Sequence, residues 1–179
     1  FNGCYIGYIT NDKWYDKSGN GLHGTVSGAT DENTAGAPVI SANHPAFSAY
    51  PASQQDDIAN DSHVDIAFGT ERFDQDNNFA TPTFTAPVTG KYQFNVHIVL
   101  TNMDSAASYY YVRLNTSNED YFSYIDPDFG QDSGDWSISF SVLADMDVSD
   151  TAKVTMRTSD GTAQADVKTE SRFSGYLVC

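Results

Sequence analysis

Aromatic side chains recur at fixed spacing between residues 68 and 96, and this pattern constrains the fold more than any other part of the chain. From Tyr92 to Leu100, apolar and polar residues alternate strictly, as they do in a strand with one buried face. Residues 136–142 repeat the alternation, with a serine at every polar position. The chain therefore predicts antiparallel strands whose apolar faces meet in one core.

The remainder of the chain from residue 45 onward also indicates β-structure. No segment has helical periodicity. Turn signals separate short strand patterns at Asn77–Asn78, Asp126–Pro127, Ser133–Gly134 and Asp160–Gly161. Many short strands at such spacing favour an all-β sandwich. The further expected strands are residues 46–50, 62–68, 108–115, 120–125, 151–158 and 172–178.

Residues 1–44 differ in composition, being rich in Gly, Asn, Asp, Ser and Thr. Because Gly and Asn adopt positive φ at low cost, residues 16–26 indicate turns. Short strands are expected at Tyr5–Ile9 and Thr25–Val26. We place a boundary near residues 43–45, which divides the chain into a Gly/Asn-rich N-terminal connector, residues 1–44, and a head, residues 45–179.

The chain is strongly acidic, since 9 Lys and Arg oppose 24 Asp and Glu, for a formal charge of −15. Such a surface repels phosphate backbones and anionic lipids, so we expect no nucleic-acid partner and no membrane insertion. No apolar run is long enough for a transmembrane helix. With 40% apolar and 13% aromatic residues, the chain can bury one sizeable core.

The two ends of the chain leave two questions open. Cys4 and Cys179 are the two cysteines. A disulfide between them and a pair of reduced thiols are both compatible with the sequence, so the redox compartment stays open. The start at Phe1 is typical of a fragment or a processed product.

The core pattern resembles that of the complement C1q globular-head family. The resemblance covers residues 45–179 and includes the closing strand Arg172–Leu177. It departs from the family in a shorter connection between Phe79 and Phe84 and in Val96, which stands where an aromatic residue is common. The positions that carry the resemblance are Phe47, Phe68, Asp74, Phe79, Phe84, Gly90, Tyr92, Phe94, Phe173 and Gly175.

This resemblance implies an antiparallel jelly-roll β-sandwich of the C1q/TNF type, which assembles as a homotrimer and binds partners rather than catalysing a reaction. The residues add two expectations of their own. Gly90 is expected to take positive φ in a tight turn before the next strand. Tyr92 and Phe94 are expected to share the buried face of that strand.

No catalytic motif stands out in the sequence. The chain has no nucleophile elbow, no zinc-protease motif and no phosphate-binding glycine loop. Its four histidines are scattered, and His97 falls on the polar face of a strand, which favours a surface or interface role. A pair of glycosidase carboxylates is not excluded by counting, but the Asp residues cluster in loops, where a raised pKa is not expected.

One acidic loop carries a calcium hypothesis. Asp126, Asp128, Asp132 and Asp135 fall within ten residues of one another, and Ca²⁺ takes oxygen ligands from closely spaced carboxylates. The resemblance agrees, since C1q-like heads sometimes carry Ca²⁺ in loops at one end. The competing interpretation is a solvated acidic loop. A second, weaker candidate set is Asp145, Asp147 and Asp150.

Three consecutive tyrosines, Tyr109, Tyr110 and Tyr111, form a candidate interface. In a strand, Tyr109 and Tyr111 share one face and Tyr110 lies on the other. Tyrosine is favoured at interfaces because it joins a large apolar body to a polar tip. One face is therefore expected in the core and the other in a trimer contact or a glycan-stacking surface, with ordinary sheet packing as the alternative.

Residues 14–29 have a separate, short resemblance, which rests on the Gly-rich turn at Asp16–Gly21. This segment resembles part of a laminin-G-like or concanavalin-like sandwich. It is also similar to segments that precede C1q-like heads in structural proteins of bacteriophages. The resemblance implies a connector to a longer fibre or virion attachment region.

Together these observations favour a non-enzymatic virion protein: the trimeric head of a bacteriophage tail fibre, spike or capsid fibre. Its partners would be host-surface glycans or proteins, or other virion proteins. The alternative is a secreted C1q-domain lectin or recognition protein, for which Asn60 and Asn115 begin candidate N-glycosylation triplets. A third interpretation, a fragment of a polysaccharide-degrading enzyme, needs a catalytic domain outside these residues. A purely architectural role is also open.

Overall fold

The chain divides into two units, Phe1–Val39 and Ile40–Cys179. In the first unit, the computed structural model shows three short antiparallel strands, β1 (Tyr8–Thr10), β2 (Lys13–Tyr15) and β3 (Gly24–Thr25), in the order β1-β2-β3. The structure describes residues 8–10, 13–15, 24–25 and 44–178. The expected strand at Tyr5–Ile9 overlaps β1 and the one at Thr25–Val26 overlaps β3, and the rest of both lies outside the described residues, as do Cys4 and Cys179. β2 was not predicted. The boundary at residues 44 and 45 stays a prediction.

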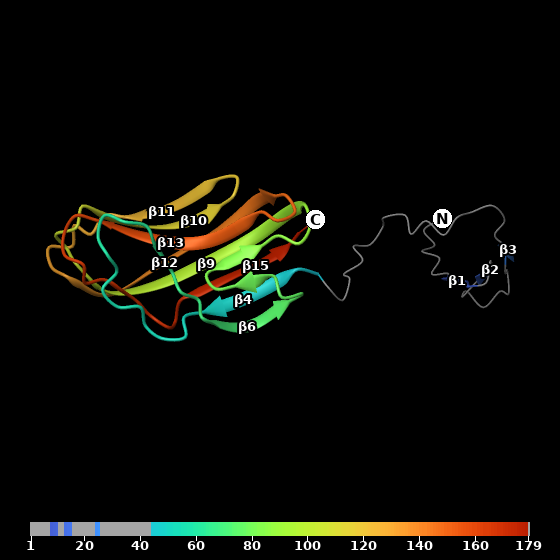
Figure 1. Ribbon diagram of the computed structural model, residues 1–179, viewed down its shortest axis with the longest axis horizontal. Coiled ribbons are helices and arrows are strands. Elements are labelled where there is room, and N and C mark those ends of the chain that lie inside the picture. Colours follow the sequence, from blue (N-terminus) through green and yellow to red (C-terminus); the bar gives the residue numbers. More distant parts are fainter. Residues whose placement is uncertain (1–7, 11–12, 16–23, 26–43, 179) are drawn as a thin grey trace, which may run out of the picture. The chain divides into compact units, whose positions relative to one another are not determined.

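The second unit is a sandwich of two antiparallel sheets (Figure 1), and no helix occurs among its described residues. One sheet, called here the β10 sheet, runs β11-β10-β13-β8-β7, with β5 beside β13. Its strands are β5 (Val64–Asp65), β7 (Phe79–Ala80), β8 (Thr83–Thr85), β10 (Tyr109–Thr116), β11 (Asp120–Ile125) and β13 (Thr151–Ser159).

The other sheet, called the β9 sheet, runs β12-β9-β15-β4-β6, with β14 beside β9. Its strands are β4 (Ala46–Tyr50), β6 (Thr70–Gln75), β9 (Gly90–Met103), β12 (Ser133–Met146), β14 (Asp166–Val167) and β15 (Arg172–Leu177). From β9 to β15 the chain passes back and forth between the two layers, which is the jelly-roll arrangement. The predicted fold class is therefore confirmed.

Aromatic rings from both sheets meet in the core. Phe47 of β4 stacks on Phe84 of β8, with ring centroids 4.9 Å apart, and meets Phe173 of β15 edge to face, also at 4.9 Å. Phe94 of β9 completes the group at 5.9 Å from Phe173. All of the expected aromatic motif positions are buried, at 0 to 2% exposure: Phe47, Phe68, Phe79, Phe84, Tyr92, Phe94 and Phe173.

The glycine at position 175 is required by this aromatic core. A Cβ built on Gly175 would lie 2.6 Å from the Phe94 ring and 2.9 Å from the Phe47 ring. Real Cβ atoms do not approach ring carbons so closely, so any side chain here would push the rings apart. The small residue at this position of β15 lets the Phe47 and Phe94 rings cross over the strand.

Asp74 fixes the turn that delivers Phe79 to the core. Its carboxylate accepts hydrogen bonds from the backbone N–H groups of Asn78, at 3.1 Å, and Phe79, at 2.9 Å. Asp76 and Asn77 between them take positive φ, which Asp and Asn tolerate better than most residues. The short β7–β8 hairpin that follows sets Phe79 directly opposite Phe84. The shorter connection between these two residues thus keeps both rings in the core.

Several local expectations were wrong. Gly90 does not take positive φ, since the described glycines that do are Gly130 and Gly161. The chain instead bends at residues 87–89, where the Tyr92 hydroxyl donates to the Val88 carbonyl at 2.8 Å, and Gly90 is already the first residue of β9.

Two strand limits also differ from the prediction. Ser133–Gly134 lies inside β12 rather than in a turn, because the pairing of β12 with β9 extends to Met103. The strand expected at residues 62–68 is reduced to β5, and the polar strand β6 was not predicted.

Val96, expected to be loosely packed, is 2% exposed. Among the residues described, no helix has the length and apolar character needed to span a bilayer.

We expect Gly175→Ala to lower the free energy of unfolding by about 1–3 kcal/mol, because the added methyl group overpacks the core. Chemical denaturation followed by circular dichroism measures the change. Gly134→Ala is the matched control, since a Cβ at Gly134 meets no atom within 4 Å. Equal stability of the two variants would contradict the packing account.

Candidate functional site

The exposed surface of the β10 sheet carries a group of four aromatic residues, which we call the aromatic face. Tyr109 and Tyr111 come from β10, and Phe122 and Tyr124 come from β11. The β10–β11 register sets Tyr111 directly opposite Tyr124. Because side chains alternate along each strand, all four project from the same side of the sheet.

The rings of the aromatic face pack in two layers. Tyr111 is 5% exposed and lies under the others, 5.3 Å from Phe122 and 5.1 Å from Tyr124, both edge to face. Phe122 and Tyr124 stack on each other at 5.8 Å and are 43% and 62% exposed. The lower ring supports the two upper rings, which present a broad apolar surface to solvent.

Tyr110 lies on the opposite side of β10, as strand alternation predicts. It is fully buried, and its hydroxyl accepts a hydrogen bond from the Asp104 N–H at 2.8 Å. Burial raises the pKa of Tyr110 above its ordinary value. Tyr110 is therefore a core residue, Tyr109 and Tyr111 lie on the outward side of the sheet with Tyr111 covered by other rings, and the interface role of the tyrosines stays a prediction.

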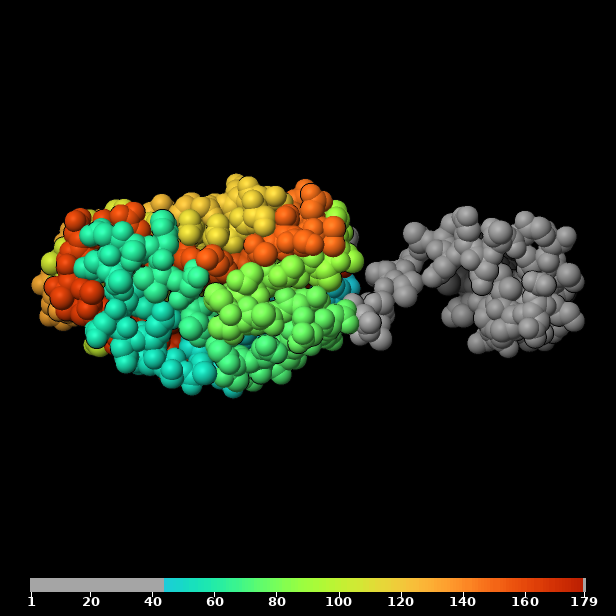
Figure 2. Space-filling model, viewed as in Figure 1, coloured from blue at the N-terminus to red at the C-terminus, as the bar shows by residue number. Residues whose placement is uncertain are grey.

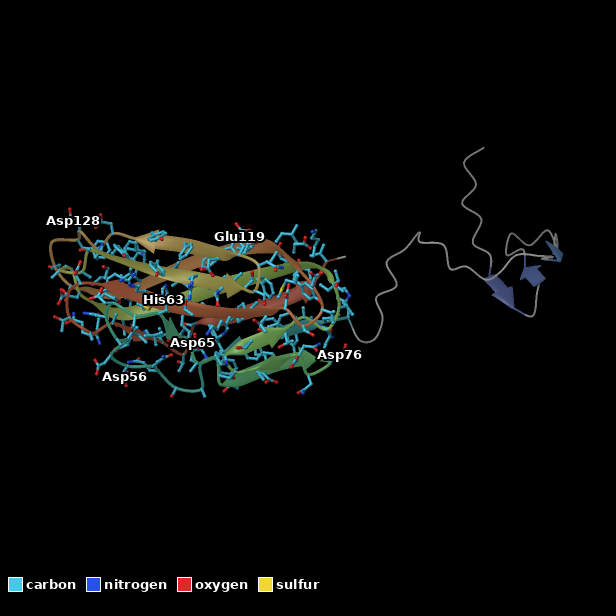
Figure 3. The ribbon with its side chains drawn as sticks, turned by 45° about the horizontal axis from the view of Figure 1, so that its top comes forward. Asp56, His63, Asp65, Asp76, Glu119 and Asp128 are labelled. Carbon is cyan, nitrogen blue, oxygen red and sulfur yellow. The ribbon has the colours of Figure 1, made fainter. Side chains whose placement is uncertain are left out.

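His63 joins the aromatic face from the segment that leads into β5. That segment lies on the surface beside β13 and the loop after it (Figure 2), and Figure 3 labels His63 there. The Tyr111 hydroxyl bonds to His63 Nε2 at 2.5 Å. Partial burial, followed by the charges of Arg113 and Arg157, lowers the pKa of His63. The lowered pKa of His63 favours its uncharged ring, and the imidazole tautomer decides whether Nε2 or the Tyr111 hydroxyl is the donor.

Three basic side chains border the aromatic face, and each has an acidic partner. They come from β10 and β13, so the sheet register places them in neighbouring rows beside the rings. The pairs are Arg113 with Asp120 at 3.0 Å, Lys153 with Asp65 at 2.9 Å, and Arg157 with Asp61 at 3.6 Å. The aromatic face and its border therefore carry no net charge, in a chain whose formal charge is −15.

The exposed surface of the β9 sheet is different in kind. Small polar side chains fill its middle, with the exposed Leu143 and Tyr176 in the row beside them. His97 Nδ1 bonds to the Ser139 hydroxyl at 2.7 Å, so His97 lies on a polar surface as predicted. The residues of this surface, called the serine face, are Asn95, His97, Ser137, Ser139, Ser141 and Ser174. Most of them, with Arg172, line a shallow depression of about 370 Å³. Because these side chains are small, a second copy of the chain can approach this surface closely.

The side of the sandwich between β11 and β12 is its open edge, because each is the last strand of its sheet. Trp136 is 42% exposed and stacks on Phe129 at 5.0 Å. Phe140 and Val142, on the same side of β12 as Trp136, are half-buried, whereas Leu143 follows Ser141 on the outward side of the strand and is 56% exposed. Apolar side chains so placed are incompletely covered by their own chain.

The four carboxylates of the calcium hypothesis do not gather in the structure. Asp132 accepts hydrogen bonds from the Ser105 N–H and hydroxyl, which lower the pKa of its carboxyl. Asp135 pairs with Lys168 at 3.3 Å, and Asp126 contacts the N–H of Asp128. Figure 3 shows Asp128 at the end of the sandwich opposite to Asp76.

The second acidic set is also divided. Asp145 pairs with Lys91 at 2.7 Å, whereas the carboxylate of Asp150 accepts the Asp147 N–H at 2.8 Å. Within residues 44–178 and the short strands before them, no three His, Cys, Asp or Glu side chains are grouped as a metal site would require. The calcium hypothesis stays a prediction from loop composition.

Sequence reasoning singled out Tyr109 and Tyr111 but missed the residues that complete the face. The missing signal was the hairpin register. Residues 115 and 120 close the β10–β11 hairpin, so counting back along each strand places Tyr124 opposite Tyr111 and Phe122 opposite Arg113. His63 carried no comparable signal, because it arrives from a segment distant in sequence.

Residues 46–178 match the family described as C1q domain. Among solved structures, the globular domain of zebrafish complement 1qA protein is 20% identical, with a TM-score of 0.56 over 76% of this chain and 98% of that one. Murine APRIL is 10% identical, with a TM-score of 0.53 over 75% of this chain and 99% of that one. No curated protein sequence matches the chain. At these identities the solved structures show the sandwich fold, and the family match agrees with the resemblance seen in the sequence.

The calcium hypothesis predicts a higher melting temperature in calcium than in chelator, because the ion would draw the loop carboxylates together. Asp128→Asn is expected to reduce the difference. Differential scanning calorimetry of both proteins in both buffers measures it. Equal melting temperatures of the wild-type chain in calcium and in chelator would remove the hypothesis.

We expect His63 to titrate below its ordinary pKa of 6.5, which NMR of the imidazole protons measures directly. Because the folded state disfavours the charged ring, the unfolded state binds the proton more readily. The stability of the wild-type chain relative to His63→Gln is therefore complete above about pH 6.5 and falls as the pH drops through the lower folded value. A midpoint at or above 6.5 would contradict this environment for His63.

Proposed function

The chain belongs to the C1q domain family, and we propose that it is a homotrimeric, non-enzymatic head that attaches a fibre or virion to a host surface. C1q domains are generally non-catalytic binding modules, and C1q and TNF family members typically form homotrimers. The observation that carries the proposal is that one sandwich has both an incompletely covered open edge and a shallow serine face.

These two surfaces differ, so a contact between them is heterologous. The edge of one copy packs against the serine face of the next, and such a contact forms a ring when the rotation closes. Trp136 and Leu143 would bury apolar area that a single chain leaves in water. Small serine side chains permit the close approach that this burial requires.

Three-fold assembly repeats each binding surface three times. Linked copies that engage the same host surface bind it far more tightly than one copy does, because the second and third contacts form at high effective concentration. The aromatic face lies on the β10 sheet and is not part of the serine face, so it stays available for such contacts. Attachment of this kind requires no bond cleavage.

The environment of the candidate glycosylation sites bears on the secreted alternative. The side-chain amide of Asn60 donates to the Gly161 carbonyl at 2.8 Å, and that of Asn115 donates to Asp120 at 2.7 Å. Both amides bond within the fold, where an attached glycan would displace them. This argues against glycans at Asn60 and Asn115, and glycan mass on the native protein would favour the secreted alternative.

We expect the purified chain to have a native mass of three times 19.6 kDa by light scattering. Ser139→Arg is expected to shift the mass to that of a monomer, because a large charged side chain would stand in the middle of the serine face. Ser53→Arg is the matched control, since Ser53 is exposed and lies outside both surfaces.

Circular dichroism of each variant confirms that the fold is kept. A wild-type chain that stays monomeric would contradict the proposed assembly. A trimer that survives Ser139→Arg unchanged would contradict the choice of the serine face as its contact surface.

A further inference from the structure

We infer that the aromatic face binds an uncharged saccharide through stacking on Phe122 and Tyr124, an inference that rests on the proposed attachment function and names its ligand class. Three parts of the structure support it: the exposed rings, the balance of charge around them, and the hydrogen-bonding groups within reach. Each part concerns side chains on β10, β11 and β13 and in the segment before β5.

The first part is ring presentation. Phe122 and Tyr124 follow each other on one side of β11, nearly parallel at 25°, and are 43% and 62% exposed. Tyr111 supports both from below, and its own hydroxyl is tied to His63. The platform is therefore built before any ligand arrives, which avoids the entropy cost of ordering loose side chains on binding. Ring faces carry partial negative charge and suit the weakly positive C–H groups of a sugar ring.

The second part is charge. Each cation beside the platform is paired with a carboxylate: Arg113 with Asp120, Lys153 with Asp65 and Arg157 with Asp61. Burial and the nearby Arg113 and Arg157 lower the pKa of His63, which disfavours its charged form. An anionic ligand would meet cations that already have carboxylate partners, although Arg157 is 3.6 Å from Asp61 and its Nε has no hydrogen-bond partner, and the ligand would be repelled by a chain of charge −15. A cationic ligand would have to compete with bound guanidinium and ammonium groups, so an uncharged ligand fits best.

The third part is hydrogen bonding. Guanidinium groups only donate and carboxylates only accept, so a border of paired Arg and Asp offers both functions side by side. A hydroxyl group donates and accepts, and it can bond to both members of a pair without separating them. Arg113 illustrates this, since it already bonds to the Thr155 hydroxyl at 3.0 Å while holding Asp120. Hydroxyls around an apolar ring face are what a saccharide presents.

A second copy of the chain is the other candidate occupant, and the side chains argue against it. Tyr121 and Ile125 of β11 pack against the core and alternate with Phe122 and Tyr124, which point outward from the β10 sheet. A contact between the β12 edge and the serine face, both on the β9 sheet, leaves the aromatic face outside. Placing the paired charges of the border in a subunit contact would also cost their remaining hydration.

Affinity electrophoresis of the full chain tests the inference. Native gels contain dextran, mannan or galactomannan as neutral probes, or alginate as an anionic probe. We expect retardation in at least one neutral gel and none in alginate. Phe122→Ser combined with Tyr124→Ser is expected to weaken binding roughly tenfold or more, as removal of central aromatic anchors does. Phe73→Ser is the matched control, because Phe73 is 51% exposed on β6, away from the aromatic face.

Light scattering of the same samples separates this inference from the proposed assembly. A double variant that stays trimeric and loses retardation supports saccharide binding. Absence of retardation by all three neutral probes, or equal loss in Phe73→Ser, overturns the saccharide inference and leaves the trimer intact. A double variant that becomes monomeric overturns it too, because the aromatic face would then be a subunit contact. A wild-type chain that is monomeric yet retarded would contradict the assembly alone.

Discussion

The structure depends on the close contact of Phe47, Phe94 and Phe173 across Gly175. These rings come from three neighbouring strands of the β9 sheet and interlock with Phe84 from the β10 sheet. Their mutual distances of 4.9 to 6.4 Å fix the separation of the two layers where the strands cross. With the layers so placed, strand alternation decides which side chains face solvent, and hence the composition of both surfaces.

The two surfaces suit different partners for physical reasons. Serine and asparagine side chains on the β9 sheet line a shallow depression that a second copy can cover closely. The β10 sheet instead presents ordered rings bordered by paired charges. A rigid apolar platform within a neutral, hydrogen-bonding border suits a ligand that is itself part apolar and part hydroxylated. One sandwich can therefore assemble through its β9 sheet and bind a ligand through its β10 sheet at the same time.

The sequence predicted much of this fold because the core strands alternate regularly. The limits of β4 and β11 were predicted, as was the burial of Tyr92 and Phe94, since one period assigns a whole strand. Strands without that alternation were missed: β6 is polar and largely exposed, and β14 has two residues. The expected turn at Gly90 failed because composition shows which residues permit positive φ but not which ones use it.

The candidate site was only partly predictable. Tyr109 and Tyr111 stand out as a pair, but Phe122 becomes their neighbour through hairpin register and His63 through a contact between distant segments. The central claim is that the β9 sheet is covered in the native protein and the aromatic face is not. Hydroxyl-radical footprinting of the native assembly tests it most directly. The account predicts protection of Trp136 and Leu143, which are 42% and 56% exposed in the single chain, with ready modification of Phe122 and Tyr124. Free modification of Trp136 and Leu143 with protection of Phe122 and Tyr124 would contradict it.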